Sequence, residues 1–298
     1  MRIAITGWTG LIGHAVAQRL QEAGHEIVRL GRAAGSDFHA DLGAKPSIAP
    51  GALGDCDALV HAAGVTDEDF ADREAAYGKA QAGTSALLAA ARAASVPWLA
   101  YVSSAHVYGP LEGRIDESRA ADPRSDYAKA HLAAEALFRR EAETRDAAVL
   151  LVRPCAVYGM PPSLERFARW SLIPFDFPRQ AVGGRIVLKS HGLQRRNFVP
   201  AEGVGQLAGW WLSEPREGCT VANAPGRAEC TVYEFATLCA RIAQEERGSA
   251  VAIDRPAPSG PEAVPLEYLT RVSGHLPGPS LEDHVRGLVR ALSTKAPA

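Results

Sequence analysis

Paired cysteines, an excess of basic charge and long apolar runs are all missing from this sequence. The five cysteines lie far apart without a Cys-x-x-Cys pair, which argues against a zinc or disulfide framework and favours a reduced intracellular protein. A formal net charge of −2 argues against binding to nucleic acid or to a membrane, so we expect a small-molecule partner. No apolar run approaches a membrane span, and the chain opens directly on a strand pattern without a signal peptide, which predicts a cytoplasmic protein. The histidines lack metal-ligand spacing, so no metal site is predicted.

Three glycines after the first apolar run are the most informative feature that is present. Residues 2–13 read RIAITGWTGLIG, in which Gly7, Gly10 and Gly13 follow a predicted strand and open a predicted helix. Glycine lets the backbone turn sharply and lets a pyrophosphate approach it, and the N-terminus of a helix favours negative charge. This context favours a dinucleotide site over a turn that serves packing alone.

Apolar β-type runs alternate with helical patterns through the first half of the chain. We predict strands over 3–6, 27–30, 58–62, 98–103 and 149–153, and helices over 11–23, 67–78, 80–94 and 125–142. The alternation predicts an α/β fold with a Rossmann-type, doubly wound parallel sheet.

Beyond Gly159 the pattern loosens. A Pro-rich piece with one strand, at 186–189, occupies 160–195, and we predict further strands at 220–223 and 251–254 and helices at 202–213, 232–244 and 281–293. We therefore predict a dinucleotide-binding domain of residues 1–159 with about 196–224. A smaller, non-contiguous C-terminal substrate lobe would hold about 160–195 and 225–298.

Two hydroxyl residues stand out as candidates for catalysis. Ser104 ends the fourth predicted strand, and Tyr127 lies just inside the start of a predicted helix. Both fall on the carboxyl side of the sheet, where open α/β folds bind ligands. A tyrosine with a lowered pKa can pass a proton to or from a carbonyl or alcohol oxygen, a serine can hold that oxygen, and a nicotinamide can exchange the hydride.

Five segments in order resemble the extended short-chain dehydrogenases/reductases of the NAD-dependent epimerase/dehydratase family, over nearly the whole chain. They are TGWTGLIG, LVHAAG (59–64), VSSAHVYG (102–109), LVRPCAVYG (151–159) and RRNFVPAEGV (195–204). The resemblance implies that Ser104 positions the substrate oxygen and that Tyr127 is the acid/base. It also implies cofactor contacts from Gly7, Thr9, Gly10, Leu11, Ile12, Gly13, Asp41, Leu42, Ala62, Ala63, Gly64, Tyr127, His131, Pro154 and Val157.

The chain departs from the family at the position four residues after the tyrosine. The family has a lysine there, which holds the nicotinamide ribose and lowers the tyrosine pKa, whereas this chain has His131. Lys129 points to nearly the opposite side of the helix and should not substitute. His131 lies on the same face as Tyr127 and is assigned the lysine's place, but it would often be uncharged at neutral pH. The site is therefore either retuned or altered in its chemistry.

Substrate contacts are predicted from two further residues. Arg196 falls where the family often has an arginine on a substrate diphosphate, with a surface salt bridge as the alternative. His106 follows Ser104 by two residues and would share its side of the strand. Two asparagines common in nucleotide-sugar epimerases are replaced, by Ala156 and Ala80, so a nucleotide sugar is not required by the pattern.

The end of the second predicted strand bears on the choice of cofactor. NAD-preferring members place an acidic residue there to hold the ribose hydroxyls, whereas this chain reads Leu30-Gly31-Arg32. A guanidinium suits a 2′-phosphate, so Arg32 favours NADP(H) over NAD(H), with a solvated loop charge as the alternative.

Three functions remain open at this point. We favour an NADP(H)-dependent oxidoreductase acting on a sugar-like or nucleotide-linked carbonyl. The alternatives are a nucleotide-sugar epimerase/dehydratase with tightly bound NAD, and a non-catalytic NADP(H)-binding sensor, which the missing lysine favours and the Ser104 and Tyr127 pair argues against. By resemblance alone, the helices at 67–94 and 125–142 match those that build a four-helix bundle in relatives, which implies a homodimer.

Overall fold

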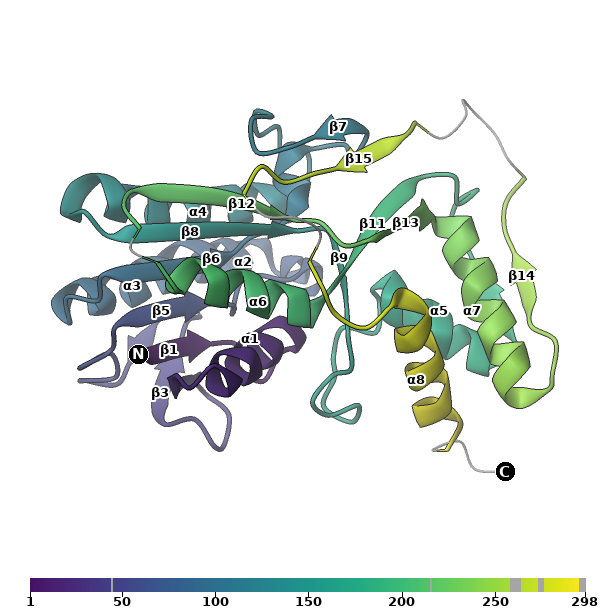
Figure 1. Ribbon diagram of the computed structural model, residues 1–298, viewed down its shortest axis with the longest axis horizontal. Helices are drawn as coiled ribbons and strands as arrows, with labels where there is room; N and C mark the ends of the chain where they lie inside the picture. The colour runs from purple at the N-terminus through teal and green to yellow at the C-terminus, as the bar shows by residue number, and fades with distance from the viewer. Residues whose placement is uncertain (44, 215, 258–263, 273–275, 295–298) are drawn as a thin grey trace.

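A large twisted sheet forms the centre of the protein (Figure 1). The computed structural model describes all residues except 44, 215, 258–263, 273–275 and 295–298. The strands of this sheet are β1 (Arg2–Thr6), β2 (Glu26–Gly31), β3 (Phe38–Asp41), β4 (Ser47–Ile48), β5 (Ala58–His61), β6 (Trp98–Val102), β8 (Ala148–Pro154) and β12 (Cys219–Ala224). Their order is β12-β8-β6-β5-β1-β2-β3-β4, and every pairing is parallel except that of β3 with β4. The chain runs outward from β1 in both directions, so the predicted doubly wound Rossmann-type fold is confirmed.

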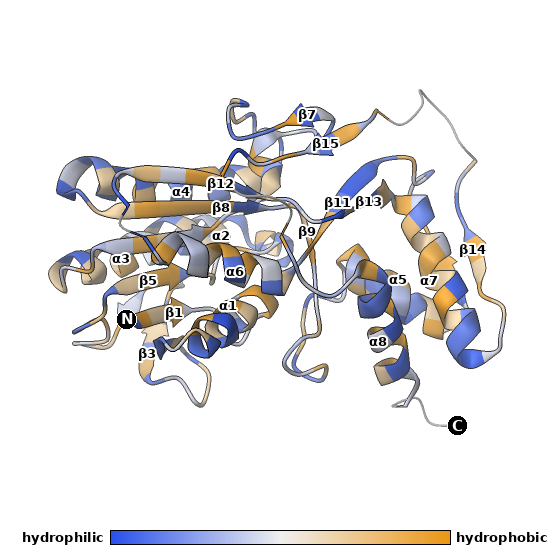
Figure 2. Cartoon of the chain, in the orientation of Figure 1, coloured by the Kyte–Doolittle hydropathy of each residue, from blue (hydrophilic) through white to orange (hydrophobic). Residues whose placement is uncertain are grey.

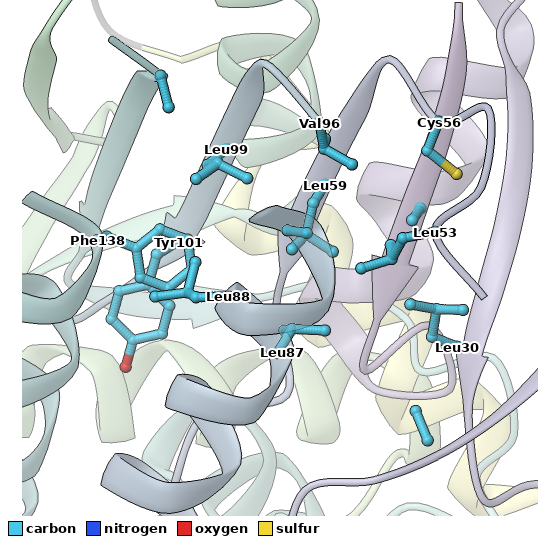
Figure 3. Close-up of a cluster of buried hydrophobic side chains, with 14 of the residues drawn as sticks. Leu30, Leu53, Cys56, Leu59, Leu87, Leu88, Val96, Leu99, Tyr101 and Phe138 are labelled. Atoms are coloured by element: carbon cyan, nitrogen blue, oxygen red, sulfur yellow. The ribbon is translucent and has the colours of Figure 1, made fainter. Parts of the chain in front are cut away.

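Helices cover both faces of the sheet. On one face lie α1 (Leu11–Glu22) and α6 (Ala201–Leu212), and on the other lie α3 (Thr84–Ala93) and α4 (Asp126–Arg145). Figure 2 shows strands coloured as apolar along their length between helices that are apolar on one side only. All seven residues of β8 are buried, as expected for a parallel strand covered on both faces. Figure 3 shows the core beneath α3, where Leu87 and Leu88 meet Leu59 and Leu99.

The predicted helices at 67–78 and 80–94 are broken into shorter pieces. They consist of the 3₁₀ helix η1 (Asp67–Ala71), α2 (Arg73–Gly78), the π-helical turn η2 (Lys79–Gly83) and α3. Asp72 starts α2 because its side chain accepts a hydrogen bond from the amide of Ala75 at 3.0 Å. The π-helical turn adds a residue to one turn and so changes which side chains of η2 face the sheet.

A helix stands where the sequence predicted only a Pro-rich piece. It is α5 (Ile173–Val182), with Pro174 in its first turn and Pro178 in its interior. Proline fits the first turn of a helix because the amide there has no intrahelical partner. Pro178 leaves the carbonyl of Pro174 without its usual donor, and His284 Nε2 donates to that carbonyl at 3.0 Å instead. A tertiary contact therefore compensates the interior proline, which the sequence pattern did not show.

Smaller elements lie beyond the end of the large sheet (Figure 1). They include α7 (Val232–Arg247) and α8 (Leu281–Ser293), which pack with α5 around Phe235 and Val285. The short strands are β7 (Gly113–Ile115), β9 (Ala156–Tyr158), β10 (Arg185–Val187), β11 (Arg195–Pro200), β13 (Ala228–Thr231), β14 (Ala252–Asp254) and β15 (Leu266–Tyr268). Of these, β10 and β14 were predicted, and they pair in parallel. The division into two domains at the boundaries given above stays a prediction.

The register of the central strands places three polar side chains in one row. Thr6 at the end of β1 pairs with His61 on β5, and His61 pairs with Tyr101 on β6. The row lies at the carboxyl edge of the sheet. Ser125 caps α4 by accepting a hydrogen bond from the amide of Ala128, which puts Tyr127 in the first turn of that helix beside the same edge.

Candidate active site

A cleft of about 790 Å³ opens at the carboxyl edge of the sheet, next to the glycine turn. Gly7 has φ +72°, which favours glycine, and a Cβ there would lie 2.7 Å from the carbonyl carbon of Ala62. A Cβ on Gly13 would lie 2.1 Å from the Gly7 carbonyl oxygen. Both glycines are thus required for the close approach of α1 to β1 and β5.

The N-terminus of α1 is aimed at this turn and has no capping side chain. Gly10 is its N-cap residue and provides no side-chain hydrogen bond. The first amides of a helix have no intrahelical partner, so they remain available to an anion. The backbone around Gly7 and Gly13 admits no side chain, and α1 begins without a side-chain cap. This glycine cradle and the free helix N-terminus together fit a pyrophosphate group.

Eighteen residues line the cleft, and seven of them were predicted as cofactor contacts. The seven are Gly7, Thr9, Arg32, Asp41, Leu42, Ala63 and Gly64. The remaining predicted contacts do not line the cleft: Gly10, Leu11, Ile12, Gly13, Ala62, Tyr127, His131, Pro154 and Val157. Gly13 and Ala62 instead shape the turn from behind, through the close backbone contacts described above.

Arg32 lies at the end of β2 on the rim of the cleft. Its side chain is 74% exposed, and Nη1 lies 4.0 Å from the Asp41 carboxylate across the cleft mouth. Trp8 forms the neighbouring wall and donates from Nε1 to Ser36 Oγ at 3.1 Å. Sequence reasoning missed Trp8, although it stands inside the glycine motif, because the motif assigns a role only to the glycines.

Lys79 and Asp69 are two further cleft residues that the sequence did not single out. Lys79 Nζ lies 2.9 Å from an Asp69 carboxylate oxygen, and both side chains line the cleft. Lys79 is the first residue of the π-helical turn η2. A regular helical projection of the sequence cannot place it, because the extra residue in that turn changes the projection.

Ser104 and Tyr127 lie together as predicted. Ser104 is buried at the start of the 3₁₀ helix η3 (Ala105–Tyr108), where its Oγ accepts from the His106 amide at 3.2 Å. Burial raises the pKa of Tyr127 above its usual value, and a hydrogen bond from Ser104 opposes this shift. The lowered tyrosine pKa that the sequence argument calls for is therefore wrong for this structure. At neutral pH Tyr127 holds its proton.

His131 is buried one helical turn after Tyr127. The two rings meet edge to face with centroids 4.5 Å apart. Burial is the main cause that lowers the His131 pKa, to about 4, so the imidazole is neutral at neutral pH. A neutral imidazole supplies no positive charge to Tyr127, which explains why nothing at this position offsets the effect of burial on the tyrosine.

The two predicted substrate residues lie in a second, smaller pocket. His106 and Arg196 both line this pocket of about 250 Å³, together with Arg195. Burial is the main cause that lowers the His106 pKa, and the positive charge of Arg196 lowers it further. The His106 ring also lies 6.1 Å from the Tyr127 ring, centroid to centroid, so the pocket adjoins the Ser104 and Tyr127 pair.

The described residues thus fit a nicotinamide dinucleotide on three counts. Gly7 and Gly13 make a backbone cradle, Gly10 opens an uncapped helix, and the buried Nε2 of His131 lacks a hydrogen-bond partner in the part of the chain that the structure describes. When bound, a nicotinamide dinucleotide supplies or takes a hydride. Tyr127 can then donate or accept the proton, and Ser104 can hold the substrate oxygen.

No group of three or more histidine, cysteine or carboxylate side chains is placed to hold a metal ion among the described residues. The five cysteines are free thiols. No helix of this part of the chain is both long enough and apolar enough to cross a membrane.

Comparison with known proteins defines the class. The model of the NAD dependent epimerase/dehydratase family matches residues 3–222. The chain therefore belongs to this family.

Individual relatives are more distant. A UDP-glucose 4-epimerase from Streptomyces lividans is 32% identical over 154 residues, which are 46% of this chain and 46% of that protein, so the match spans less than half of the relative. The structure of RMD from Pseudomonas aeruginosa, complexed with NADPH, has a TM-score of 0.79 and 24% identity, with 99% of each chain covered. A UDP-glucose 4-epimerase from Thermotoga maritima with UDP-glucose has a TM-score of 0.78 and 18% identity, with 99% of each chain covered. These two structures share the fold.

Proposed function

We propose that the protein is an NADP(H)-dependent oxidoreductase acting on a carbonyl or alcohol group of a nucleotide-linked or other sugar-like metabolite. The observation that carries this proposal is that Tyr127, next to Ser104, contacts His106 of the Arg196 pocket on one side and His131 on the other. His131 in turn lies against Gly64 in the wall of the large cleft. In these roles Tyr127 is the proton donor and Ser104 positions the substrate oxygen.

The state of Tyr127 supports reduction over oxidation. Its raised pKa keeps the phenol protonated at neutral pH, and a protonated phenol can donate to a carbonyl oxygen that receives a hydride. Oxidation of an alcohol would need the phenolate first. The family resemblance assigns the lowering of the tyrosine pKa to a lysine, and His131 stands in its place here.

Arg32 supports the choice of NADP(H). It lies at the end of β2 on the rim of the cleft, where no carboxylate follows the strand, and it is free enough to reach a 2′-phosphate. Asp41 at 4.0 Å is its competing partner, but an ion pair this exposed is worth little.

A nucleotide sugar is supported by the pocket around Arg196. Arg195 and Arg196 both line a pocket next to Tyr127, and arginine suits a diphosphate through paired hydrogen bonds. Arg195 is already paired with Glu229 at 3.1 Å. Arg196 Nη1 donates to the Arg195 carbonyl and is the better candidate for the diphosphate.

The experiment is calorimetric titration with NADPH, NADH, NADP⁺ and NAD⁺. We expect NADPH to bind best, and Arg32→Ala to weaken its binding about tenfold or more while changing NADH binding little, because a charge-assisted contact to the 2′-phosphate is lost. Arg114→Ala is the matched control, since the Arg114 side chain is 68% exposed and pairs with Glu267 on β15, away from the cleft lining. A screen of nucleoside diphosphate sugars and their keto forms for NADPH consumption then tests the reaction.

A second candidate is an epimerase with tightly held NAD. The similarity to the Streptomyces lividans UDP-glucose 4-epimerase favours it. NAD that copurifies with the protein, together with sugar interconversion without NADPH consumption, would replace our proposal by this one. Binding of all four forms too weak to measure would overturn both and leave a protein that has lost its cofactor.

A further inference from the structure

His131 lies directly behind the wall of the cofactor cleft. Gly64 forms that wall, and a Cβ on Gly64 would lie only 3.1 Å from His131 Cε1. The His131 side chain is buried, at 3% exposure of the residue. The imidazole is thus separated from the cleft by a residue without a side chain.

Tyr101 on β6 contacts the imidazole at Nδ1. Its hydroxyl lies 2.7 Å from His131 Nδ1, and the residue is 1% exposed. The Tyr101 ring stacks on Phe138 at 5.2 Å and on His61 at 5.3 Å between centroids, which fixes its orientation. Figure 3 shows the two rings of Tyr101 and Phe138 side by side, with the hydroxyl pointing away from the aliphatic cluster.

The direction of this hydrogen bond follows from the chemistry of the two groups. Burial raises the Tyr101 pKa well above its usual value, so the phenol keeps its proton. A neutral imidazole has one donor and one acceptor nitrogen. Among the described residues, Nδ1 is the one acceptor within hydrogen-bond distance of the Tyr101 hydroxyl, so we take the hydroxyl as the donor and place the imidazole proton on Nε2.

His131 Nε2 is the atom left over by this arrangement. It is buried and has no hydrogen-bond partner of normal geometry among the described residues. The backbone of Val65 is close enough to raise the imidazole pKa against the larger effect of burial. An unpaired buried donor costs about 1–3 kcal/mol. The structure therefore holds an unpaired donor on an imidazole whose neighbouring atom Cε1 faces Gly64 in the cleft wall.

We propose that Tyr101 is a positioning residue that fixes His131 as the Nε2–H tautomer, so that His131 offers a neutral hydrogen-bond donor to a dinucleotide bound in the cleft. This inference rests on the cofactor site of the proposed function. The active site then keeps the hydrogen bond of the family's lysine and gives up its positive charge. Tyr101 acts only through His131 and touches neither substrate nor cofactor.

The surroundings oppose protonation of His131. The titratable and charged groups around it are Tyr101 and His61 on the sheet, Tyr127 and the ion-paired Glu135 on its own helix, His106 on η3, Lys79 on η2, and Arg169 in the segment before α5. The cations among them repel a second positive charge. Cofactor affinity should therefore carry no His131 titration between about pH 5.5 and pH 8.

The test begins with nitrogen-15 histidine NMR of the cofactor-free protein, with the His131 signal assigned by its loss in His131→Gln. We expect an unprotonated Nδ1 and a protonated Nε2 at neutral pH. Tyr101→Phe keeps the stacked ring and removes only the hydroxyl. In this variant we expect a mixture of tautomers and NADPH binding roughly threefold to tenfold weaker, which corresponds to one hydrogen bond.

Tyr268→Phe is the matched control. Tyr268 is also 1% exposed, and its hydroxyl donates to the Arg153 carbonyl at 2.6 Å, so a comparable buried hydrogen bond is lost. We expect a similar loss of stability, with the His131 tautomer and NADPH affinity unchanged. If Tyr268→Phe changes the His131 tautomer and the NADPH affinity as much as Tyr101→Phe does, Tyr101 has only a structural role and the inference is overturned.

The remaining outcomes separate this inference from the proposed function. A protonated Nδ1 or an imidazolium in the wild-type protein at neutral pH overturns the inference, whatever cofactor binds. The expected tautomer in a wild-type protein that binds no dinucleotide overturns the proposed function and the role toward cofactor, while it supports the Tyr101–His131 assignment.

Discussion

Glu135 on α4 and Arg153 on β8 form a buried ion pair in which Arg153 Nε and Nη2 donate to the two carboxylate oxygens at 2.9 and 2.6 Å. The Arg153 guanidinium also lies 4.6 Å from the centre of the Tyr108 ring. Glu135 follows His131 by one helical turn. The pair therefore ties the helix that carries Tyr127 and His131 to the central sheet.

Removal of one member of this pair should be strongly destabilising. Glu135→Ala leaves the Arg153 charge buried without its partner, and we expect the free energy of unfolding to fall by about 3–5 kcal/mol, measured by denaturant titration. Glu143→Ala, at an exposed position of the same helix, should change it by less than about 0.5 kcal/mol. The double variant Glu135→Leu with Arg153→Met should be more stable than Glu135→Ala, and the opposite order would contradict this account.

Tyr127→Phe should abolish turnover while leaving NADPH binding nearly intact. The change removes the proton donor and keeps the ring that packs beside His131. Turnover of the substrate found in the screen and calorimetric NADPH affinity are the two measurements. Retained turnover would remove Tyr127 from the proposed mechanism, and it would be the result expected of neither an oxidoreductase nor an epimerase of this type.

His131→Lys should shift the pH dependence of turnover to lower pH or tighten cofactor binding. A lysine at this position stands on the Tyr127 face of α4, and its charge favours the phenolate over the phenol. His131→Gln is the neutral control and should leave the profile in place while weakening binding. If the lysine and glutamine variants have the same profile and the same affinity, position 131 does not act on Tyr127.

Gly13→Ala should disrupt the cofactor site and the fold together. The new Cβ would meet the Gly7 carbonyl oxygen at 2.1 Å, and neither backbone segment can move without displacing α1 from β1. We expect loss of NADPH binding and a lower melting temperature. Gly209→Ala on α6 is the control, because its Cβ would meet only Leu20 Cδ2 at 3.7 Å, and it should stabilise the protein by about 0.5–1 kcal/mol.

Stability should fall on mild acidification because three histidines are buried in the neutral form. Burial is the main cause that lowers the pKa of His61 to about 3 and those of His131 and His284 to about 4. The unfolded chain binds these protons from about pH 6.5 downward and the folded protein does not, so each histidine removes about 1.4 kcal/mol per pH unit between pH 6.5 and its folded pKa.

Denaturant unfolding between about pH 8 and pH 5 measures this slope, since carboxylates in the unfolded chain titrate mainly below that range. His284→Gln should reduce the slope by one proton and can still donate to the Pro174 carbonyl. A stability that stays flat over this range would contradict neutral burial of all three histidines.

Local patterns were sufficient where one element follows directly from its own residues. Apolar runs predicted the five parallel strands, and glycine spacing predicted the turn after the first of them. The helical pattern that begins at Ser125 predicted the start of α4. Each of these signals acts over only a few residues. The pairing of Ser104 with Tyr127 also followed, since both lie at carboxyl ends of the same parallel sheet.

Patterns failed where a distant contact compensates a local defect. Two prolines argued against α5, and His284, 110 residues away, supplies the donor that Pro178 lacks. Short strands such as β9 and β11 pair with each other across the chain and carry little periodicity of their own. Lys79 reached the cleft through a π-helical turn that no residue type marks.

The sequence by itself determined the class of fold, the glycine cradle and the identity of the serine, tyrosine and histidine at the active site, because these depend on residue type and near-neighbour spacing. Only the tertiary structure decided how those groups ionise. Tyr127 retains its proton because it is buried without an adjacent ammonium, and His131 is a neutral donor because Tyr101, on a strand 30 residues earlier, occupies its other nitrogen. Protonation depends on solvent exclusion and on partners brought together by folding, which residue spacing does not encode.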